Sequence, residues 1–304
     1  MGHRYRSLFW PAALILVGVF ALLINSGLVP PERLGRVLDL WPLILVVIGL
    51  ELIVRRALQG AAAELAAVLI VLVAICGAAA YVALGPAIPT GTQTLDASAK
   101  TGGLDHATVH VDVGAANITM AGSSSIGDNL FRAHIDYSGR KPDVSLDQST
   151  GDVHISQGDA SGFFFQVRRF VLSLQLNTSV QWKVEVNTGA ATDTFNLTSV
   201  HVAGMDLNTG ASHEDITLGT PSGTVPITVN GGALTVNAHR PNGVAASAAV
   251  SGGAVNLNFD GHQSHAIGNL TAQSSDYDGA SDRYQIQVNG GASNVTVDTS
   301  APSG

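Results

Sequence analysis

A short phrase that recurs between residues 182 and 297 constrains this chain more than any other feature. Its five copies end in Asn-Thr-Gly-Ala, Asn-Gly-Gly-Ala or Ser-Gly-Gly-Ala and occupy residues 184–190, 205–211, 227–233, 248–254 and 286–292. Successive turn glycines in the first four copies are 21, 22 and 21 residues apart. A period of this length is typical of stacked repeats.

Each repeat predicts two strands joined at a glycine corner. Side chains alternate along a strand, so Val184 and Val186 share one face while Glu185 takes the other. A second alternating pair, such as Phe195 and Leu197, follows each corner. One such unit buries little apolar surface, so neighbouring units about 4.8 Å apart must supply the missing wall. The sequence predicts an all-β, single-stranded solenoid (β-helix) domain over residues 104–300, with inward columns such as Val184, Met205, Ile227, Ala248 and Ile286.

The corner residues predict a structural column. We expect the glycines to allow a positive φ at each corner. The side chains two residues before them are expected to hydrogen-bond as a ladder inside the corner, away from solvent; a ligand site in this column is the alternative. The predicted ladder and turn residues are Asn187, Gly189, Asn208, Gly210, Asn230, Gly232, Ser251, Gly253, Asn289 and Gly291.

The first 89 residues are apolar and predict transmembrane α-helices, about three in number. Apolar runs cover residues 8–24, 37–54 and 65–88, and such runs suit membrane spans. Whether residues 37–54 fully span is open, because Asp39 and Glu51 flank a short apolar core. A cleaved signal peptide is the alternative for the first run.

The predicted boundaries follow from these runs. Residues 1–57 form a paired helical hairpin, 58–89 a third helix, 90–103 a tether and 104–300 the solenoid. Basic residues at positions 4, 6, 55 and 56 favour a cytoplasmic N-terminus, and three spans then place the C-terminal domain outside the cytoplasmic membrane.

The first two apolar runs are copies of each other. Trp10-Pro11 is followed by Gly18 and Trp41-Pro42 by Gly49, at the same offset. Tryptophan suits the membrane interface, proline suits the first turn of a helix, and glycine permits close helix contact. The repeat therefore indicates two anchor helices packed together.

Charge is divided unequally between the two halves. Residues 1–89 contain six arginines and four acids, whereas residues 90–304 contain nine basic and nineteen acidic residues. The net negative charge of the C-terminal domain makes it a poor partner for nucleic acid and for anionic lipid. The single cysteine, Cys76, excludes an intrachain disulfide.

Few residues suggest chemistry, and we predict no catalytic, cofactor or metal site. Glu185 and Asp206 fall at equivalent positions of neighbouring repeats, where adjacent carboxylates can raise one pKa, hold a cation or act as an acid/base pair. A solvated acidic face is the favoured alternative. His106 with His110, His262 with His265, and the calcium candidate Asp276, Asp278 and Asp282 are weaker. The aromatic residues 162–170 are expected to cap the first repeat.

Two family resemblances cover most of the chain. The doubled Trp-Pro phrase resembles the transmembrane module of LiaI/LiaF-like bacterial membrane proteins, and the Asn-Thr/Gly-Gly-Ala repeats resemble the toastrack-like, adhesin-type β-solenoid domain. The resemblance implies a bacterial envelope protein linked to envelope stress and to membrane histidine kinases. The extra apolar run before the solenoid departs from that pattern.

These observations predict a non-enzymatic, multi-pass cell-membrane protein that senses or regulates the envelope stress response through its β-solenoid. The expected partners are the membrane, a sensor kinase or other envelope protein, and a cell-wall polymer, with no nucleic acid. The alternatives are a surface scaffold or adhesin that binds wall polysaccharide without signalling, and a polysaccharide-degrading enzyme that uses Glu185 and Asp206.

Overall fold

The computed structural model describes residues 91–157 and 169–299, together with a few isolated helical positions before residue 78. The chain divides into two compact units, and Gly91–Ala160 with Arg168–Gly304 form the second, the β domain. Of the six Trp, Pro and Gly residues named for the membrane module, Gly49 is described, as a helical residue. The others lie outside the described residues, as does Cys76: Trp10, Pro11, Gly18, Trp41 and Pro42. No helix among the described residues is long and apolar enough to cross a membrane.

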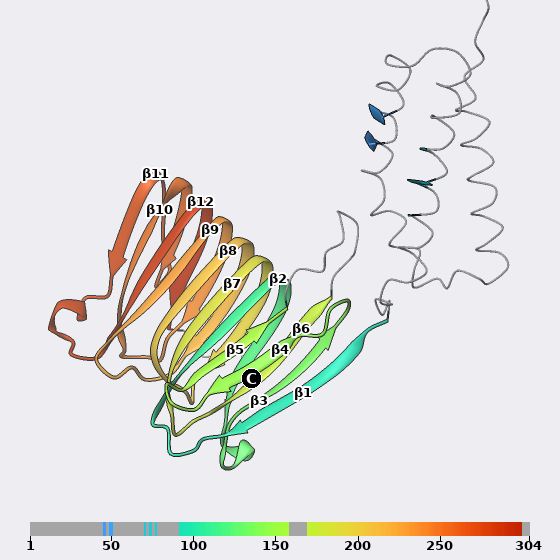
Figure 1. Cartoon of the computed structure of the whole chain (residues 1–304). Coiled ribbons are helices and arrows are strands. Elements are labelled where there is room, and N and C mark those ends of the chain that lie inside the picture. Colours follow the sequence, from blue (N-terminus) through green and yellow to red (C-terminus); the bar gives the residue numbers. More distant parts are fainter. Residues whose placement is uncertain are drawn as a thin grey trace, which may run out of the picture. The chain divides into compact units, whose positions relative to one another are not determined.

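The β domain contains twelve strands in the described ranges (Figure 1). They are β1 (Gln93–Lys100), β2 (His106–Ser123), β3 (Asn129–Tyr137), β4 (Asp143–Asp147), β5 (Asp152–Ser156), β6 (Phe170–Asn177), β7 (Gln181–Leu197), β8 (His201–Leu218), β9 (Thr224–His239), β10 (Ala245–Phe259), β11 (His262–Gln273) and β12 (Arg283–Asp298). Two 3-10 helices, η2 (Ser124–Ile126) and η3 (Tyr277–Gly279), lie between strands. The pairing order is β1-β3-β6-β2-β7-β8-β9-β12-β10-β11, and β5 links β4 to β2.

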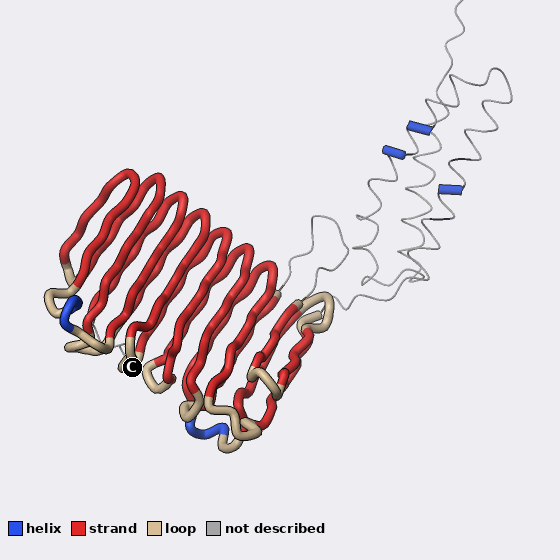
Figure 2. The backbone as a smooth tube through the Cα atoms, turned by 60° about the vertical axis from the view of Figure 1, so that its left-hand side comes forward, coloured by secondary structure: helices blue, strands red, loops and turns tan. Residues whose placement is uncertain are grey.

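Each long strand bends at its glycine corner into two arms. In β7 the first arm precedes Gly189 and the second follows it, and Figure 2 shows the same bend repeated along the stack. The first arm of β2 pairs with β5, whereas its second arm pairs with β6. The arms therefore form two sheet layers, and the predicted solenoid is confirmed.

Apolar side chains from both arms form one core. The inward residues Val184, Met205, Ile227 and Ile286 are all at most 1% exposed, and Phe195 and Leu197 in the second arm of β7 are fully buried. Burial of these alternating side chains removes apolar surface from water at about 25 cal/mol per Å², which favours the stacked arrangement.

The order of the last strands in space differs from the order in sequence. Ile286 of β12 pairs with Ile227 of β9 on one side and with Ala248 of β10 on the other, so the final repeat is inserted within the stack. The interval between the fourth and fifth copies of the phrase contains β11, which runs antiparallel to β10. Asp260 and Gly261 have φ values of 50° and 84°, as a two-residue Asp-Gly hairpin requires.

Arg240 links the β9–β10 connection to the end of β10, next to the end of the inserted strand β12. Its guanidinium donates to both carboxylate oxygens of Asp260 at 2.8 and 2.7 Å, its Nε donates to the Val244 carbonyl, and it lies over the Phe259 ring. The backbone N–H groups of Arg240 and Asp260 donate to carbonyls at the end of β12. The β9–β10 connection is therefore tied across β12.

The corner glycines are required for a reason other than the one expected. None of the five has a positive φ, since the positive-φ residues of the described ranges lie elsewhere. A Cβ on Gly189 would approach the carbonyl oxygen of Gly114 to 2.6 Å, and a Cβ on Gly232 would approach that of Gly210 to 2.8 Å. Glycine is thus needed because the corners stack closely, and Gly114, Gly189, Gly210, Gly232, Gly291 and Gly253 form one column.

Two features at the N-terminal end differ from expectation. The range 90–103, predicted to be a tether, contains β1, whose apolar residues Leu95, Ala97 and Ala99 alternate with polar ones and pack against the core. Phe170, predicted to belong to a cap, is buried in β6; residues 158–168 lie outside the described residues.

Candidate functional site

A row of ionisable side chains crosses the outer face of the first arms. The register places His154 of β5, His110 of β2, Glu185 of β7 and Asp206 of β8 side by side. Towards the other end of the stack, uncharged residues occupy the same row: Thr228, Gln287 and Ala249. The predicted neighbours Glu185 and Asp206 are therefore brought together, and two histidines extend the row.

Basic and imidazole nitrogens contact the carboxylates of this row. Lys183 Nζ lies 2.6 Å from Glu185 Oε1 and 3.2 Å from Asp206 Oδ2, and His110 Nδ1 lies 2.8 Å from Glu185 Oε2. The His110 and His154 rings stack with centroids 4.6 Å apart. Such an arrangement organises a charged surface across four strands.

The electrostatics of Glu185 do not suit a general acid. Its pKa is lowered, chiefly by the hydrogen bond from Lys183, and the same contact raises the pKa of Lys183. At Glu185, therefore, the neighbouring carboxylate does not produce a raised pKa. Lys183, two residues earlier on the same face, was the sequence signal for this pairing.

The corner column carries a hydrogen-bonded ladder on the outer face. Asn187, Asn208, Asn230 and Asn289 each donate from the amide nitrogen to the preceding side chain, and Ser251 donates from its hydroxyl to Asn289. The donor–acceptor distances are Asn187 to Asp112 2.7 Å, Asn208 to Asn187 3.0 Å, Asn230 to Asn208 3.0 Å, Asn289 to Asn230 2.8 Å and Ser251 to Asn289 2.7 Å.

The position of this ladder differs from the prediction. Asn187 and Asn208 are exposed and the other members half-buried, so the column does not lie inside the corner. The reason is strand parity, because Asn187 shares a face with Glu185, while Val186 takes the opposite, inward face.

Two carboxyl groups are buried inside the solenoid, and the sequence analysis did not identify them. Asp193 is 1% exposed and Glu214 fully buried, and the two residues are register partners on β7 and β8. Asp193 Oδ1 accepts from the Ile118 N–H at 3.1 Å, whereas Asp193 Oδ2 and both Glu214 oxygens have no hydrogen-bond partner. Burial raises the pKa of both groups, and for Asp193 the neighbouring Glu214 adds to the increase.

Strand parity was the signal that could have revealed this pair. Asp193 has the same parity as Phe195 and Leu197, and Glu214 the same as Ile216 and Leu218, so both must face inward. Their column elsewhere is aliphatic, containing Ile118, Val236, Val295 and Leu257.

The second arms present a flat polar outer face. One row consists of Thr192, His213, Thr235, Asn294 and Asn256, and the next of Thr194, Asp215, Asn237, Thr296 and Asn258. Hydroxyl and amide groups in register offer repeated donors and acceptors along the stack.

The remaining candidates do not assemble into a centre. His106 contacts Asp105 at 2.5 Å at the exposed start of β2, and His262 and His265 are exposed on β11. Asp282 accepts from the Gly223 N–H at 2.6 Å, and Asp278 accepts from Gln273. Across residues 91–157 and 169–299, no group of three or more histidine, cysteine or acidic residues is placed to hold a metal ion.

Comparisons with known proteins agree with this architecture. Residues 88–239 match the family described as the N-terminal domain of toast_rack, DUF2154, and residues 8–53 match the LiaI-LiaF-like transmembrane region. Both resemblances drawn from the sequence are confirmed. A search of curated proteins found no match.

One solved structure shares the fold at low identity. A crystal structure described as "a putative cell adhesion protein from Clostridium sporogenes" is 14% identical, with a TM-score of 0.62 over 69% of this chain and 100% of that chain. A "putative adhesin from Parabacteroides merdae" is 11% identical, with a TM-score of 0.30 over 68% and 80% of the two chains.

Proposed function

Since the chain belongs to the family defined by the N-terminal domain of toast_rack, we propose that this membrane-anchored envelope protein senses or regulates the envelope stress response. The β-solenoid acts outside the cytoplasmic membrane as a rigid recognition surface, and about three N-terminal helices contact a sensor kinase or another envelope protein. The protein performs no catalysis in this role.

The observation that carries the proposal is the union of two modules on one chain. A LiaI-LiaF-like transmembrane match covers residues 8–53, and the toast_rack match begins at residue 88. The β domain supports recognition because its outer rows are fixed by strand register, so a partner meets side chains at set spacings. Preorganisation of this kind lowers the entropic cost of binding.

The test compares three strains: one with the full gene, one with the gene deleted, and one expressing residues 1–90 alone. We expect the transcriptional response to wall-active antibiotics to change in both altered strains, because the recognition surface is missing from each. An unchanged response in the deletion strain rejects the regulatory role. A reporter joined after residue 304 tests the extracytoplasmic placement.

A surface scaffold that binds wall polysaccharide is the second candidate. The polar rows of the second arms favour it, because hydroxyl and amide groups in register can hydrogen-bond a repeating sugar chain. Retention of the purified β domain on wall fragments, lost on replacement of Thr192, Thr235 and Asn294 by alanine, would support it. Sugar-cleaving activity abolished by Glu185→Ala with Asp206→Ala would instead indicate the enzyme alternative.

A further inference from the structure

A cleft opens at the N-terminal end of the β domain, between strands β1 and β4. We call it the β1–β4 cleft; its volume is about 600 Å³ and its lining includes Leu95, Ala97, Arg140, Lys141 and Val144. Strand β1 ends the pairing order and β4 pairs only with β5. Among the strands that the structure describes, none continues either sheet layer beyond β1 or β4 at this cleft.

The cleft combines an apolar floor with a basic rim. Leu95, Ala97 and Val144 are partly buried and pack against the core. Arg140 and Lys141 are exposed, and no ion pair joins either to an acid among the described residues. Asp143 is the acid in the lining, so two cations face one carboxylate in a domain that is acidic as a whole.

Hydrogen bonds fix the turn that carries the two basic residues. Gln157 Nε2 donates to the carbonyl of Ser138 at 3.2 Å and to the carbonyl of Arg140 at 2.6 Å. Arg169 N–H donates to Ser138 Oγ, and Ser138 N–H donates to the Arg169 carbonyl. These hydrogen bonds fix the backbone of the turn that carries the rim. The exposed Arg169 adds a third cation beside it.

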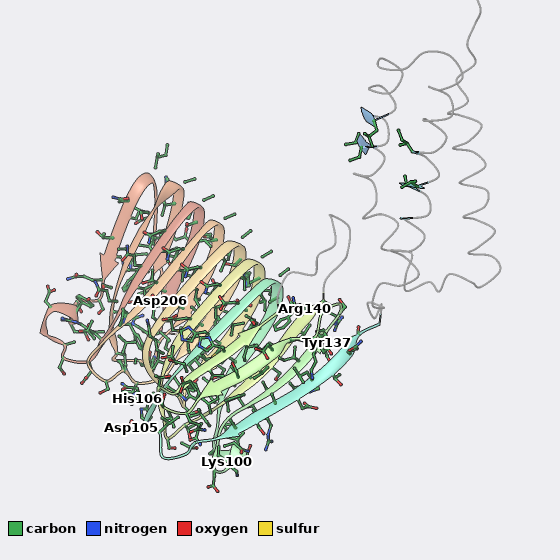
Figure 3. All side chains as sticks on the ribbon, viewed as in Figure 1. Lys100, Asp105, His106, Tyr137, Arg140 and Asp206 are labelled. Carbon is green, nitrogen blue, oxygen red and sulfur yellow. The ribbon has the colours of Figure 1, made fainter. Side chains whose placement is uncertain are left out.

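The chain length between β1 and the predicted membrane segments limits how far this cleft can lie from them. Gln93 at the start of β1 pairs with Tyr137, and Tyr137 pairs with Phe170. Residue 88 ends the third apolar run, and the five steps from there to Gln93 span at most about 18 Å. Figure 3 shows Arg140 and Tyr137 near the strand ends where β1 begins, whereas Lys100, Asp105 and His106 lie near the opposite strand ends.

From these observations we propose that the β1–β4 cleft binds an anionic phospholipid. The phosphate contacts Arg140 and Lys141, and the start of an acyl chain packs on Leu95, Ala97 and Val144. The inference rests on the proposed membrane anchoring. Because the rest of the domain is acidic and is repelled by anionic lipid, binding at one end orients the solenoid away from the membrane.

The isolated β domain, residues 91–304, is suited to the test because it has its own core and because a solved chain consists entirely of this fold. We expect it to float with phosphatidylcholine vesicles that contain phosphatidylglycerol and not with phosphatidylcholine alone. R140Q/K141Q should weaken binding about 25-fold, since each basic side chain contributes about fivefold at an anionic surface.

The matched control is K100Q/R132Q, which removes the same charge at exposed positions outside the cleft. It should change binding by less than about twofold. The proposal is overturned if R140Q/K141Q binds these vesicles as tightly as the wild-type domain does. It is also overturned if the wild-type domain does not float with vesicles that contain phosphatidylglycerol. Thermal unfolding of each variant verifies that the fold is intact.

A further arm separates a lipid from a free phosphate. Glycerol 3-phosphate should fail to displace the domain from vesicles, and Val144→Gln should weaken flotation while the domain stays folded. Full displacement by glycerol 3-phosphate overturns the phospholipid assignment. Fractionation of cells that express the full-length protein tests the anchoring separately. If the full-length protein stays in the aqueous fraction, the proposed function is rejected whatever the vesicle result.

Discussion

Asp193 and Glu214 lie side by side on neighbouring strands inside the solenoid, and neither is paired with a basic side chain among the described residues. A buried carboxylate without a cation is strongly disfavoured in a protein interior. The fold therefore retains protons on this pair under conditions in which exposed carboxyl groups are ionised.

The stability of the β domain should fall as pH rises. Burial raises the pKa of Asp193 to about 8 and that of Glu214 to about 7, whereas both are near 4 in the unfolded chain. Unfolding thus releases protons, and the free energy of unfolding declines between about pH 4 and pH 8. Between pH 5 and pH 8 we expect the free energy of unfolding, measured by urea denaturation, to fall by several kcal/mol.

The control for this prediction is an exposed acid. Asp193→Asn with Glu214→Gln should flatten the pH profile, while Asp276→Asn, in an exposed loop, should leave its slope unchanged. The single Glu214→Gln variant should show a reduced slope. A wild-type domain whose stability is constant from pH 5 to pH 8 would contradict the inferred protonation of the pair.

Gly189→Ala should destabilise the domain by about 2 kcal/mol or more. The added methyl would lie 2.6 Å from the Gly114 carbonyl oxygen, so neighbouring backbones must separate at the corner. Gly279→Ala is the matched control, because its Cβ meets no atom within 4 Å, and we expect a change within about 0.5 kcal/mol. Thermal unfolding measures both; equal melting temperatures would argue against corner stacking.

Arg240→Met should cost about 3 kcal/mol of unfolding free energy. The change removes the bidentate hydrogen bonds from the buried Arg240 to the exposed Asp260, together with the bond from Arg240 Nε to the Val244 carbonyl. Arg132→Met, at an exposed position, is the control and should be nearly neutral. Addition of Asp260→Asn to Arg240→Met should cost less than the sum of the single changes, as residues in one ion pair are coupled. If the two changes in unfolding free energy add strictly in denaturant titrations, the Arg240–Asp260 pair does not contribute to stability.

Asn208→Ala should weaken the domain by about 1 kcal/mol. It removes one ladder bond donated to Asn187 and one accepted from Asn230, and exposure limits the contribution of each. Asn256→Ala removes an exposed asparagine that lies outside the ladder and should have no measurable effect. Equal chemical stability of both variants would show that the ladder does not contribute.

Much of the fold follows from local sequence pattern. Alternation at Val184 and Val186, repeated every 21 or 22 residues, predicts the stacked strands because side-chain direction alternates along any extended chain. The same rule places Asn187 outside and Asp193 inside. Both placements could therefore have been predicted from the sequence. They were missed because an acid was expected to lie in solvent and the corner asparagines were expected to lie inside the corner.

The sequence by itself determined the bent strand, its inward aliphatic residues and the apolar N-terminal runs, since each depends on neighbours close in the chain. Only the tertiary structure decided that β12 lies between β9 and β10, that Lys183 bridges Glu185 and Asp206, and that the corner glycines meet carbonyl oxygens of adjacent strands. The physical reason is that near-identical strands can pair in several orders. Long-range packing selects one of these orders, and the Asp260-Gly261 hairpin and the Arg240–Asp260 pair are part of that packing.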